Sequence, residues 1–109
     1  MYVLDSNIVI YYFKRRGRVW ETFSGVDAGE LVLPTLVVYE LQTGIKKAGE
    51  PRRRVRELQQ LTESVRVVDF DVAAANAAAL VRAYLESQGA PIGAIDTLIA
   101  GVALSSWVC

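Results

Sequence analysis

Three short apolar runs, separated by longer segments with helix-like patterning, constrain the fold of this chain most strongly. The runs cover residues 2–4, 31–33 and 65–68, and each is short enough to be a buried strand. Strands that alternate with helices pair in parallel through right-handed crossovers. The sequence therefore predicts an α/β fold, an open parallel sheet with helices on both faces, in one domain that spans residues 1–109.

The segments between these runs carry helix start and stop signals. Thr35 is placed to cap a helix, Pro51 can start another at a position that tolerates proline, and Asp71 opens a long alanine-rich segment. The helix after Pro51 is expected to turn a stripe of apolar residues inward: Val55, Leu58 and Leu61. The expected helices cover about residues 6–17, 19–23, 35–47, 51–61, 71–87 and 92–106.

Composition excludes several classes of function. The chain has no histidine, and Cys109 is its only cysteine. An intramolecular disulfide, a cysteine-built zinc site and a Ser-His-Asp or Cys-His mechanism are therefore excluded. No apolar run approaches the roughly 18 residues of a membrane span, and no secretory signal is visible, so a cytoplasmic protein without a membrane partner is expected.

Three carboxylates interrupt segments that otherwise resemble protein core: Asp5, Glu40 and Asp96. An ionised carboxylate that is buried without compensation costs several kcal/mol, so such acids are usually paired, protonated or bound to metal. Asp5 ends the first predicted strand, where open sheets place their ligands. Oxygen ligands without histidine or cysteine suit Mg²⁺ or Mn²⁺. Alternatively, Asp5 and Asp96 are helix caps, and Glu40 is a surface residue paired with Lys47 or another cation.

The net charge is zero, yet ten of the twelve basic residues fall in two clusters. The first cluster is Lys14, Arg15, Arg16 and Arg18, and the second is Lys46, Lys47, Arg52, Arg53, Arg54 and Arg56. Clusters of this density can bind a phosphate backbone even in a neutral protein, because the local field sets the attraction. The alternative is a solvated helix face.

Three segments resemble the PIN-domain ribonucleases of the VapC toxin type. They are residues 2–7 (YVLDSN), 33–41 (LPTLVVYEL) and 91–100 (PIGAIDTLIA). The resemblance covers nearly the whole chain, in order and with the family's usual separations. It implies a PIN-like fold, cleavage of RNA with Mg²⁺ or Mn²⁺, inhibition by a cognate VapB-type antitoxin, and a homodimer.

The resemblance also implies roles for individual residues. Asp5, Glu40 and Asp96 match the acidic positions of the family's site, where they would hold the metal ions and carry catalysis. Supporting positions are matched by Ser6, Asn7 and Thr97. The basic residues expected to contact RNA or antitoxin are Lys46, Lys47, Arg52 and Arg53.

One departure from the family pattern concerns the end of the sequence. Family members continue beyond the last helix with further strands and a fourth acidic residue, whereas this sequence ends at Cys109, so a truncated C-terminus is expected. An alternative function follows, namely a PIN-like module that binds antitoxin or dimerises without cutting RNA. A phosphatase of the haloacid dehalogenase type is disfavoured, because it would need a second acid where Asn7 stands.

Overall fold

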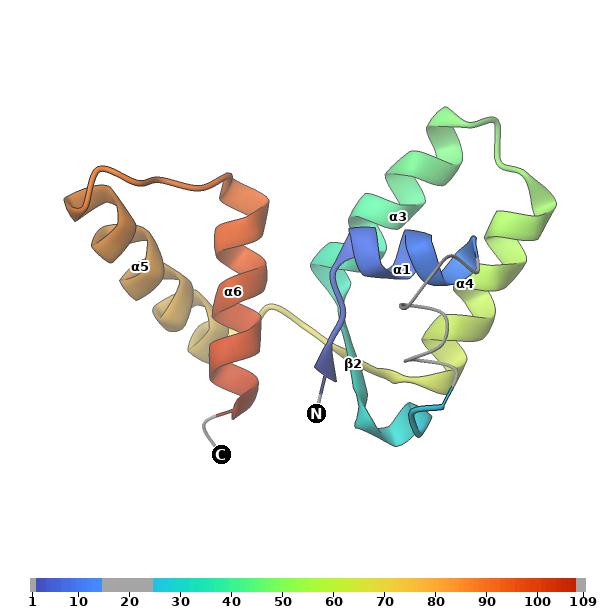
Figure 1. Ribbon diagram of the computed structural model, residues 1–109, viewed down its shortest axis with the longest axis horizontal. Helices are drawn as coiled ribbons and strands as arrows, with labels where there is room; N and C mark the ends of the chain where they lie inside the picture. The colour runs from blue at the N-terminus through green and yellow to red at the C-terminus, as the bar shows by residue number, and fades with distance from the viewer. Residues whose placement is uncertain (1, 15–24, 108–109) are drawn as a thin grey trace. The chain divides into compact units, whose positions relative to one another are not determined.

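The computed structural model describes residues 2–14 and 25–107, and its chain forms two compact units, Met1–Val67 and Val68–Cys109 (Figure 1). The two units are treated separately below. The expected short helix over residues 19–23 lies outside the described residues, as do three cations of the first basic cluster, Arg15, Arg16 and Arg18.

The sheet has three strands in the order β1-β2-β3, which are β1 (Tyr2–Val3), β2 (Leu31–Pro34) and β3 (Arg66–Val68). β1 and β2 pair in parallel, with Tyr2 opposite Leu31, and the Leu4 amide extends the pairing by donating to the Val32 carbonyl at 2.9 Å. β2 is buried along its whole length, as expected for a central strand. β1 is an edge strand, and its Tyr2 side chain is 49% exposed, so the prediction that this run is buried throughout was wrong.

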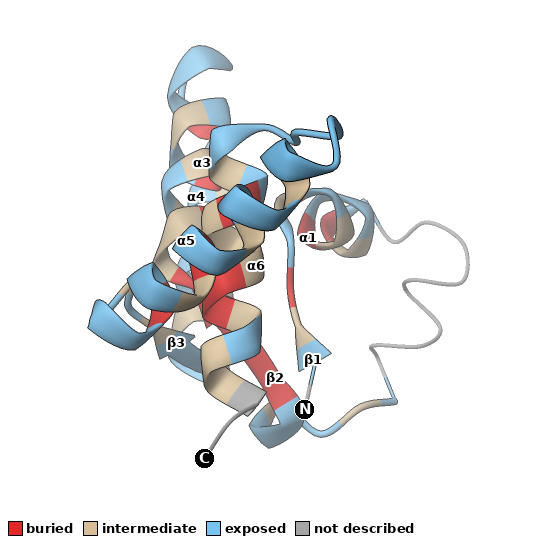
Figure 2. Cartoon of the chain, turned by 90° about the vertical axis from the view of Figure 1, so that its left-hand side faces the viewer, coloured by how far each residue is buried: buried red, intermediate tan, exposed pale blue. Residues whose placement is uncertain are grey.

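Three helices of the first unit pack their apolar residues into one core. They are α1 (Ser6–Phe13), α3 (Thr35–Lys47) and α4 (Arg52–Ser64), and a 3-10 turn, η1 (Ala28–Glu30), precedes β2. Figure 2 shows that β2 is buried, whereas β1 and β3 are exposed or intermediate, and that the helices carry separate buried positions. The core residues of this unit are Leu4, Val9, Phe13, Leu31, Val32, Leu33, Val37, Leu41, Ile45 and Leu58.

Several helix boundaries differ from the sequence prediction. Pro34 and Pro51 have extended backbones and occupy the cap positions of α3 and α4, without a side-chain cap bond. Thr35 is therefore the first helical residue and not the cap, and Pro51 lies one position before its helix. Proline fits there because its missing N–H costs nothing ahead of the first helical turn. α1 ends at Phe13, earlier than the expected end near residue 17.

The predicted inner stripe of α4 was only partly right. Leu58 is 2% exposed and Leu61 is half-buried, but Val55 is 43% exposed. Val55 lies in the second turn of a helix whose first turn consists of three exposed or half-buried arginines. The N-terminal end of α4 is therefore a charged surface, and burial begins only with the turn that contains Leu58.

The second unit is a pair of packed helices, α5 (Val72–Ser87) and α6 (Ala94–Trp107). α5 begins one residue after Asp71, which caps the helix because its Oδ1 accepts a hydrogen bond from the Ala74 amide at 2.8 Å. The helices approach closely at Gly101, where an added Cβ would lie 2.6 Å from both the Ala74 carbonyl oxygen and the Ala78 Cβ. Ala74, Ala78 and Val102 are buried around this contact. Among the described helices, none is long and apolar enough to cross a membrane.

Candidate active site

Asp5 lies directly after β1 and caps α1. Its Oδ1 accepts a 2.8 Å hydrogen bond from the Ile8 amide, and its backbone is extended, as a cap residue requires. The cap alternative is therefore realised, but it uses only one carboxylate oxygen. Asp5 is exposed, so its carboxylate is accessible to a cation from solvent.

Glu40 is half-buried in the second turn of α3. Its Oε1 accepts a 3.1 Å hydrogen bond from the hydroxyl of Ser6, the residue that follows Asp5. The bond links the start of α1 to α3 and brings the Glu40 carboxylate to the end of the helix that Asp5 caps. A surface ion pair with Lys47 is not found among the described residues, where the neighbouring Lys46 pairs with Glu50 at 3.0 Å.

Asn7 completes the polar sequence at this helix start. It is exposed in the first turn of α1, next to Ser6. The structure thus brings together four of the predicted site residues in the first unit: Asp5, Ser6, Asn7 and Glu40.

Asp96 and Thr97 belong to the second unit. Asp96 is exposed in the first turn of α6, where the helix dipole favours a negative charge. It is the third helical residue, so the alternative that it caps the helix was wrong. Thr97 is 6% exposed, and both its hydroxyl and its amide donate to the Gly93 carbonyl at 3.0 Å. Its hydroxyl therefore closes the first turn of the helix.

The three predicted metal ligands have the chemistry that a hard cation requires. Among residues 2–14 and 25–107, no lysine or arginine forms an ion pair with Asp5, Glu40 or Asp96. Within the same residues, no three acidic, histidine or cysteine side chains form a preassembled metal group. The residues fit a divalent metal ion through their free carboxylate oxygens, which are the ligands that Mg²⁺ and Mn²⁺ prefer.

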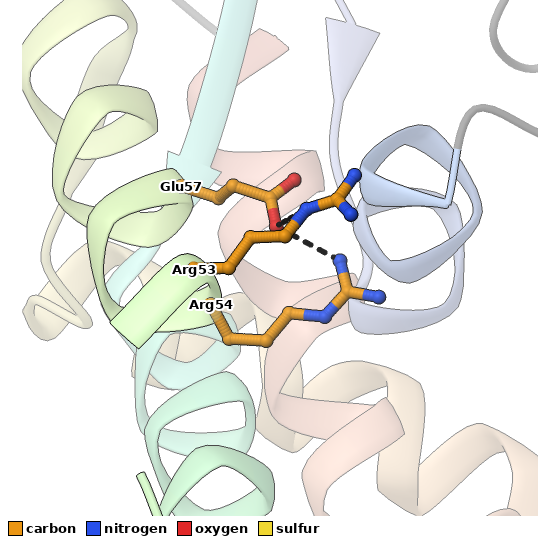
Figure 3. A network of polar contacts seen from close by, with 3 residues as sticks. All are labelled: Arg53, Arg54 and Glu57. Atoms are coloured by element: carbon orange, nitrogen blue, oxygen red, sulfur yellow. Dashed lines mark hydrogen bonds and ion pairs between the residues drawn. The ribbon is translucent and has the colours of Figure 1, made fainter. Parts of the chain in front are cut away.

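The second basic cluster is divided by two acids. Lys46 pairs with Glu50, and Glu57 Oε1 accepts a hydrogen bond from Arg54 Nη1 at 3.0 Å and forms an ion pair with Arg53 Nε at 3.5 Å (Figure 3). The sequence reading missed Glu57, although its three- and four-residue spacing from these arginines is the usual signal of a helical ion pair. Within this cluster, the exposed cations that form no ion pair with a described residue are Lys47, Arg52 and Arg56.

A cavity of about 380 Å³ in the first unit was also missed. Its walls come from α1, α4 and the segment around β2, and most of its lining residues are apolar. The α1 residues are Ile8, Val9, Tyr12 and Phe13, and the α4 residues are Glu57, Gln60, Leu61 and Ser64. Such a cavity joins side chains far apart in sequence, which periodicity alone does not reveal.

With this geometry established, comparison with known proteins decides the family. The PIN-domain family matches residues 2–106, which includes both compact units. The chain belongs to the PIN-domain family. The resemblance and the fold class inferred from the sequence are confirmed, and the two units are parts of one family match.

Relatives narrow the family further. A tRNA(fMet)-specific endonuclease VapC of Shigella flexneri is 33% identical over 105 residues, which are 95% of this chain and 79% of that protein. Ribonuclease VapC2 of Haemophilus influenzae is 32% identical over 104 residues, with the same coverage of 95% and 79%. The chain is therefore a member of the VapC ribonucleases, and PIN-domain nucleases generally use a divalent metal ion.

A solved structure of a VapBC complex is also similar to this chain over nearly its whole length. The crystal structure of DNA-bound VapBC from Salmonella typhimurium matches with a TM-score of 0.85 and 27% identity, over 95% of this chain and 79% of that chain.

Proposed function

We propose that this protein is a divalent-metal-dependent endoribonuclease, the toxin of a type II toxin–antitoxin pair. The observation that carries the proposal is the hydrogen bond from Ser6 to Glu40, which brings a second carboxylate to the helix start that Asp5 caps. Two neighbouring carboxylates that form no ion pair with a cation of the described residues favour a bound metal ion. The ribonuclease names of the relatives support the same activity.

Asp5, Glu40 and Asp96 would hold one or two Mg²⁺ or Mn²⁺ ions. Ions bound there supply a water activated at neutral pH and stabilise negative charge on the scissile phosphate. The Ile8 amide fixes the orientation of the Asp5 carboxylate, and the Ser6 hydroxyl fixes that of Glu40. The chain therefore contributes positioning, because ligands held by a second set of hydrogen bonds lose less freedom when they bind.

We also infer a VapB-type antitoxin as the partner. Support comes from the solved VapBC complexes that share this fold, including those of Salmonella typhimurium and nontypeable Haemophilus influenzae. The cavity beside α1 offers an apolar surface for a segment of such a partner. It lies against the same helix whose first turn carries Asp5, Ser6 and Asn7, so a bound segment could reach the site.

The decisive experiment measures cleavage of a labelled, structured RNA with and without Mn²⁺. Asp5→Asn should lose cleavage yet stay folded, because asparagine is as good a cap as aspartate. Asp71→Asn is the matched control, since Asp71 caps α5 through an amide bond of the same 2.8 Å length but lies outside the proposed site. Cleavage by wild type and Asp71→Asn, but not by Asp5→Asn, is the expected pattern.

The opposite result would favour the alternative function. If the folded wild type cuts no RNA at millimolar Mn²⁺ but still captures the antitoxin, the protein is a binding module. Cleavage that persists in Asp5→Asn would instead remove Asp5 from the site.

A further inference from the structure

The turn between α3 and α4, together with the first turns of α4, forms the most basic surface of the described chain. Residues 46–57 contain six cations and two acids, so this segment has a net charge of +4 in a chain whose total is zero. All six cations are exposed except Arg54, which is half-buried. We call residues 46–57 the basic turn.

Ion pairs divide the basic turn into two parts. Glu50 engages Lys46, and Glu57 engages Arg53 and Arg54 (Figure 3). Lys47, Arg52 and Arg56 are exposed and form no ion pair with a described residue. Arg52 and Arg56 are four residues apart, so they lie on the same side of α4 and are separated by about 6 Å along its axis.

The two sides of α4 differ in character. Glu57, Leu61 and Val65 line the apolar cavity, whereas Arg52 and Arg56 are rotated away from Glu57 by about 100° or more. Within residues 46–57, Val55 is the only large apolar side chain that is exposed. The core of a protein–protein interface is depleted in charge and rich in aromatic residues, which fits the cavity wall that α1 supplies with Tyr12 and Phe13 better than it fits the arginine side of α4.

We propose that Lys47, Arg52 and Arg56 bind the phosphate backbone of the RNA, while Glu57 holds Arg53 and Arg54 in place beside them. This inference rests on the proposed function and assigns the substrate-binding surface. Exposed, unpaired cations suit phosphates, because they release condensed counterions on contact without first breaking an ion pair in the protein. From the sequence, RNA contacts were expected at Lys46, Lys47, Arg52 and Arg53. We retain Lys47 and Arg52 as contacts, leave out Lys46 and Arg53, and add Arg56.

The test is the salt dependence of RNA binding. A fluorescently labelled single-stranded RNA is titrated with the full chain in EDTA at several NaCl concentrations, and the RNA is checked for integrity afterwards. Each phosphate contact contributes about 0.7 to the slope of log affinity against log salt. Arg52→Gln with Arg56→Gln should therefore reduce the slope by about 1.4 and weaken binding roughly ten- to thirty-fold at about 0.1 M salt.

Two control variants isolate the contacts from general effects. Arg66→Gln with Arg82→Gln makes the same change in net charge at two exposed arginines outside the basic turn, and should leave the slope unchanged. Arg52→Lys with Arg56→Lys keeps the charges and should restore the slope. Thermal unfolding of every variant should confirm that the exposed substitutions leave the fold intact.

Three results would overturn the inference. The slope could stay unchanged in the Arg52 and Arg56 glutamine variant, or it could fall equally in the Arg66 and Arg82 variant. Antitoxin capture could instead be lost while RNA binding is kept, which would make the basic turn a protein-binding surface. Failure of the proposed function has a different pattern, since the wild type would bind RNA through Arg52 and Arg56 without cutting it in Mn²⁺.

Discussion

The hydroxyl of Ser6 donates a 3.1 Å hydrogen bond to the carboxylate of Glu40, which lies 34 residues later in the chain. The bond joins the first turn of α1 to the second turn of α3. Because the Ser6 hydroxyl is engaged with the Glu40 carboxylate, we assign it as a positioning residue. Its effect on activity depends on how firmly it holds Glu40.

Ser6→Ala should lower the cleavage rate about tenfold and leave the apparent affinity for RNA unchanged. Removing a hydrogen bond that orients a metal ligand lowers activity or metal affinity by about ten- to one-hundredfold, and we expect the lower end of this range. Single-turnover cleavage at saturating and limiting RNA separates the two quantities, and Ser6→Thr should restore most of the rate. Ser105→Ala, which removes a hydroxyl bonded only within α6, is the control. An unchanged rate in Ser6→Ala would show that Glu40 needs no such support.

Asp5 caps α1 and is also a proposed metal ligand, and two substitutions separate these two roles. Asp5→Asn and Asp5→Ala should both abolish cleavage, but only Asp5→Ala should lower the free energy of unfolding, by about 1 kcal/mol, because alanine cannot cap α1. Asp71→Ala should show a similar loss of stability with cleavage retained. Chemical denaturation and the RNA assay measure these effects. Equal stability of the two Asp5 variants would mean that the cap bond contributes nothing.

Metal binding should be visible without any cleavage assay. A ligand that binds only the folded protein raises its stability by about 2.7 kcal/mol at a concentration one hundred times its dissociation constant. Mn²⁺ should therefore raise the melting temperature of the wild type and of Asp71→Asn, and this shift should be lost in Asp5→Asn. The same shift in all three proteins would place the metal elsewhere.

Gly101→Ala should destabilise the α5–α6 contact by about 1–3 kcal/mol. The new Cβ would lie 2.6 Å from backbone and side-chain atoms of α5, so the helices must move apart. Gly44→Ala in α3 is the matched control, because nothing lies within 4 Å of its Cβ position, and it should stabilise the protein by about 0.5–1 kcal/mol. Equilibrium unfolding in urea compares the two, and an equal effect of both would rule out close packing as the cause.

Glu50 has a left-handed backbone with φ of 56°, an uncommon conformation for a residue other than glycine. Glu50→Gly should therefore be more stable than Glu50→Gln by about 1 kcal/mol. Both substitutions remove the exposed ion pair with Lys46, so their difference isolates the backbone. If Glu50→Gln proved the more stable variant in chemical unfolding, backbone strain at this turn would be excluded.

Local sequence patterns predicted most elements of the fold. The strands and helices follow from apolar periodicity, and the start of the alanine-rich helix was predicted to within one residue of its position after Asp71, because helix starts depend on residues within one turn. The errors at Pro34, Pro51 and the end of α1 are shifts of a boundary, where neighbouring residues compete for the same role.

Contacts between residues far apart in the sequence were harder to predict from the sequence. The bond between Ser6 and Glu40 and the close approach at Gly101 depend on how distant segments pack, which periodicity does not encode. Family resemblance predicted that Ser6 and Glu40 are site residues, but only the structure shows that they contact each other. The Glu57 pairs were the exception, since their helical spacing could have been read from the sequence.

Gly101 also determines which mutations the second unit can accept. Because main-chain atoms of α5 meet α6 there, backbone contact sets the spacing of the two helices at that point. Exposed positions on the same helices, such as Leu80 and Leu104, do not influence this spacing and are free to vary. Mutational tolerance should therefore be uneven along α6, with glycine required at position 101, a tightly buried side chain at Val102, and freedom at the exposed Leu104 three residues away.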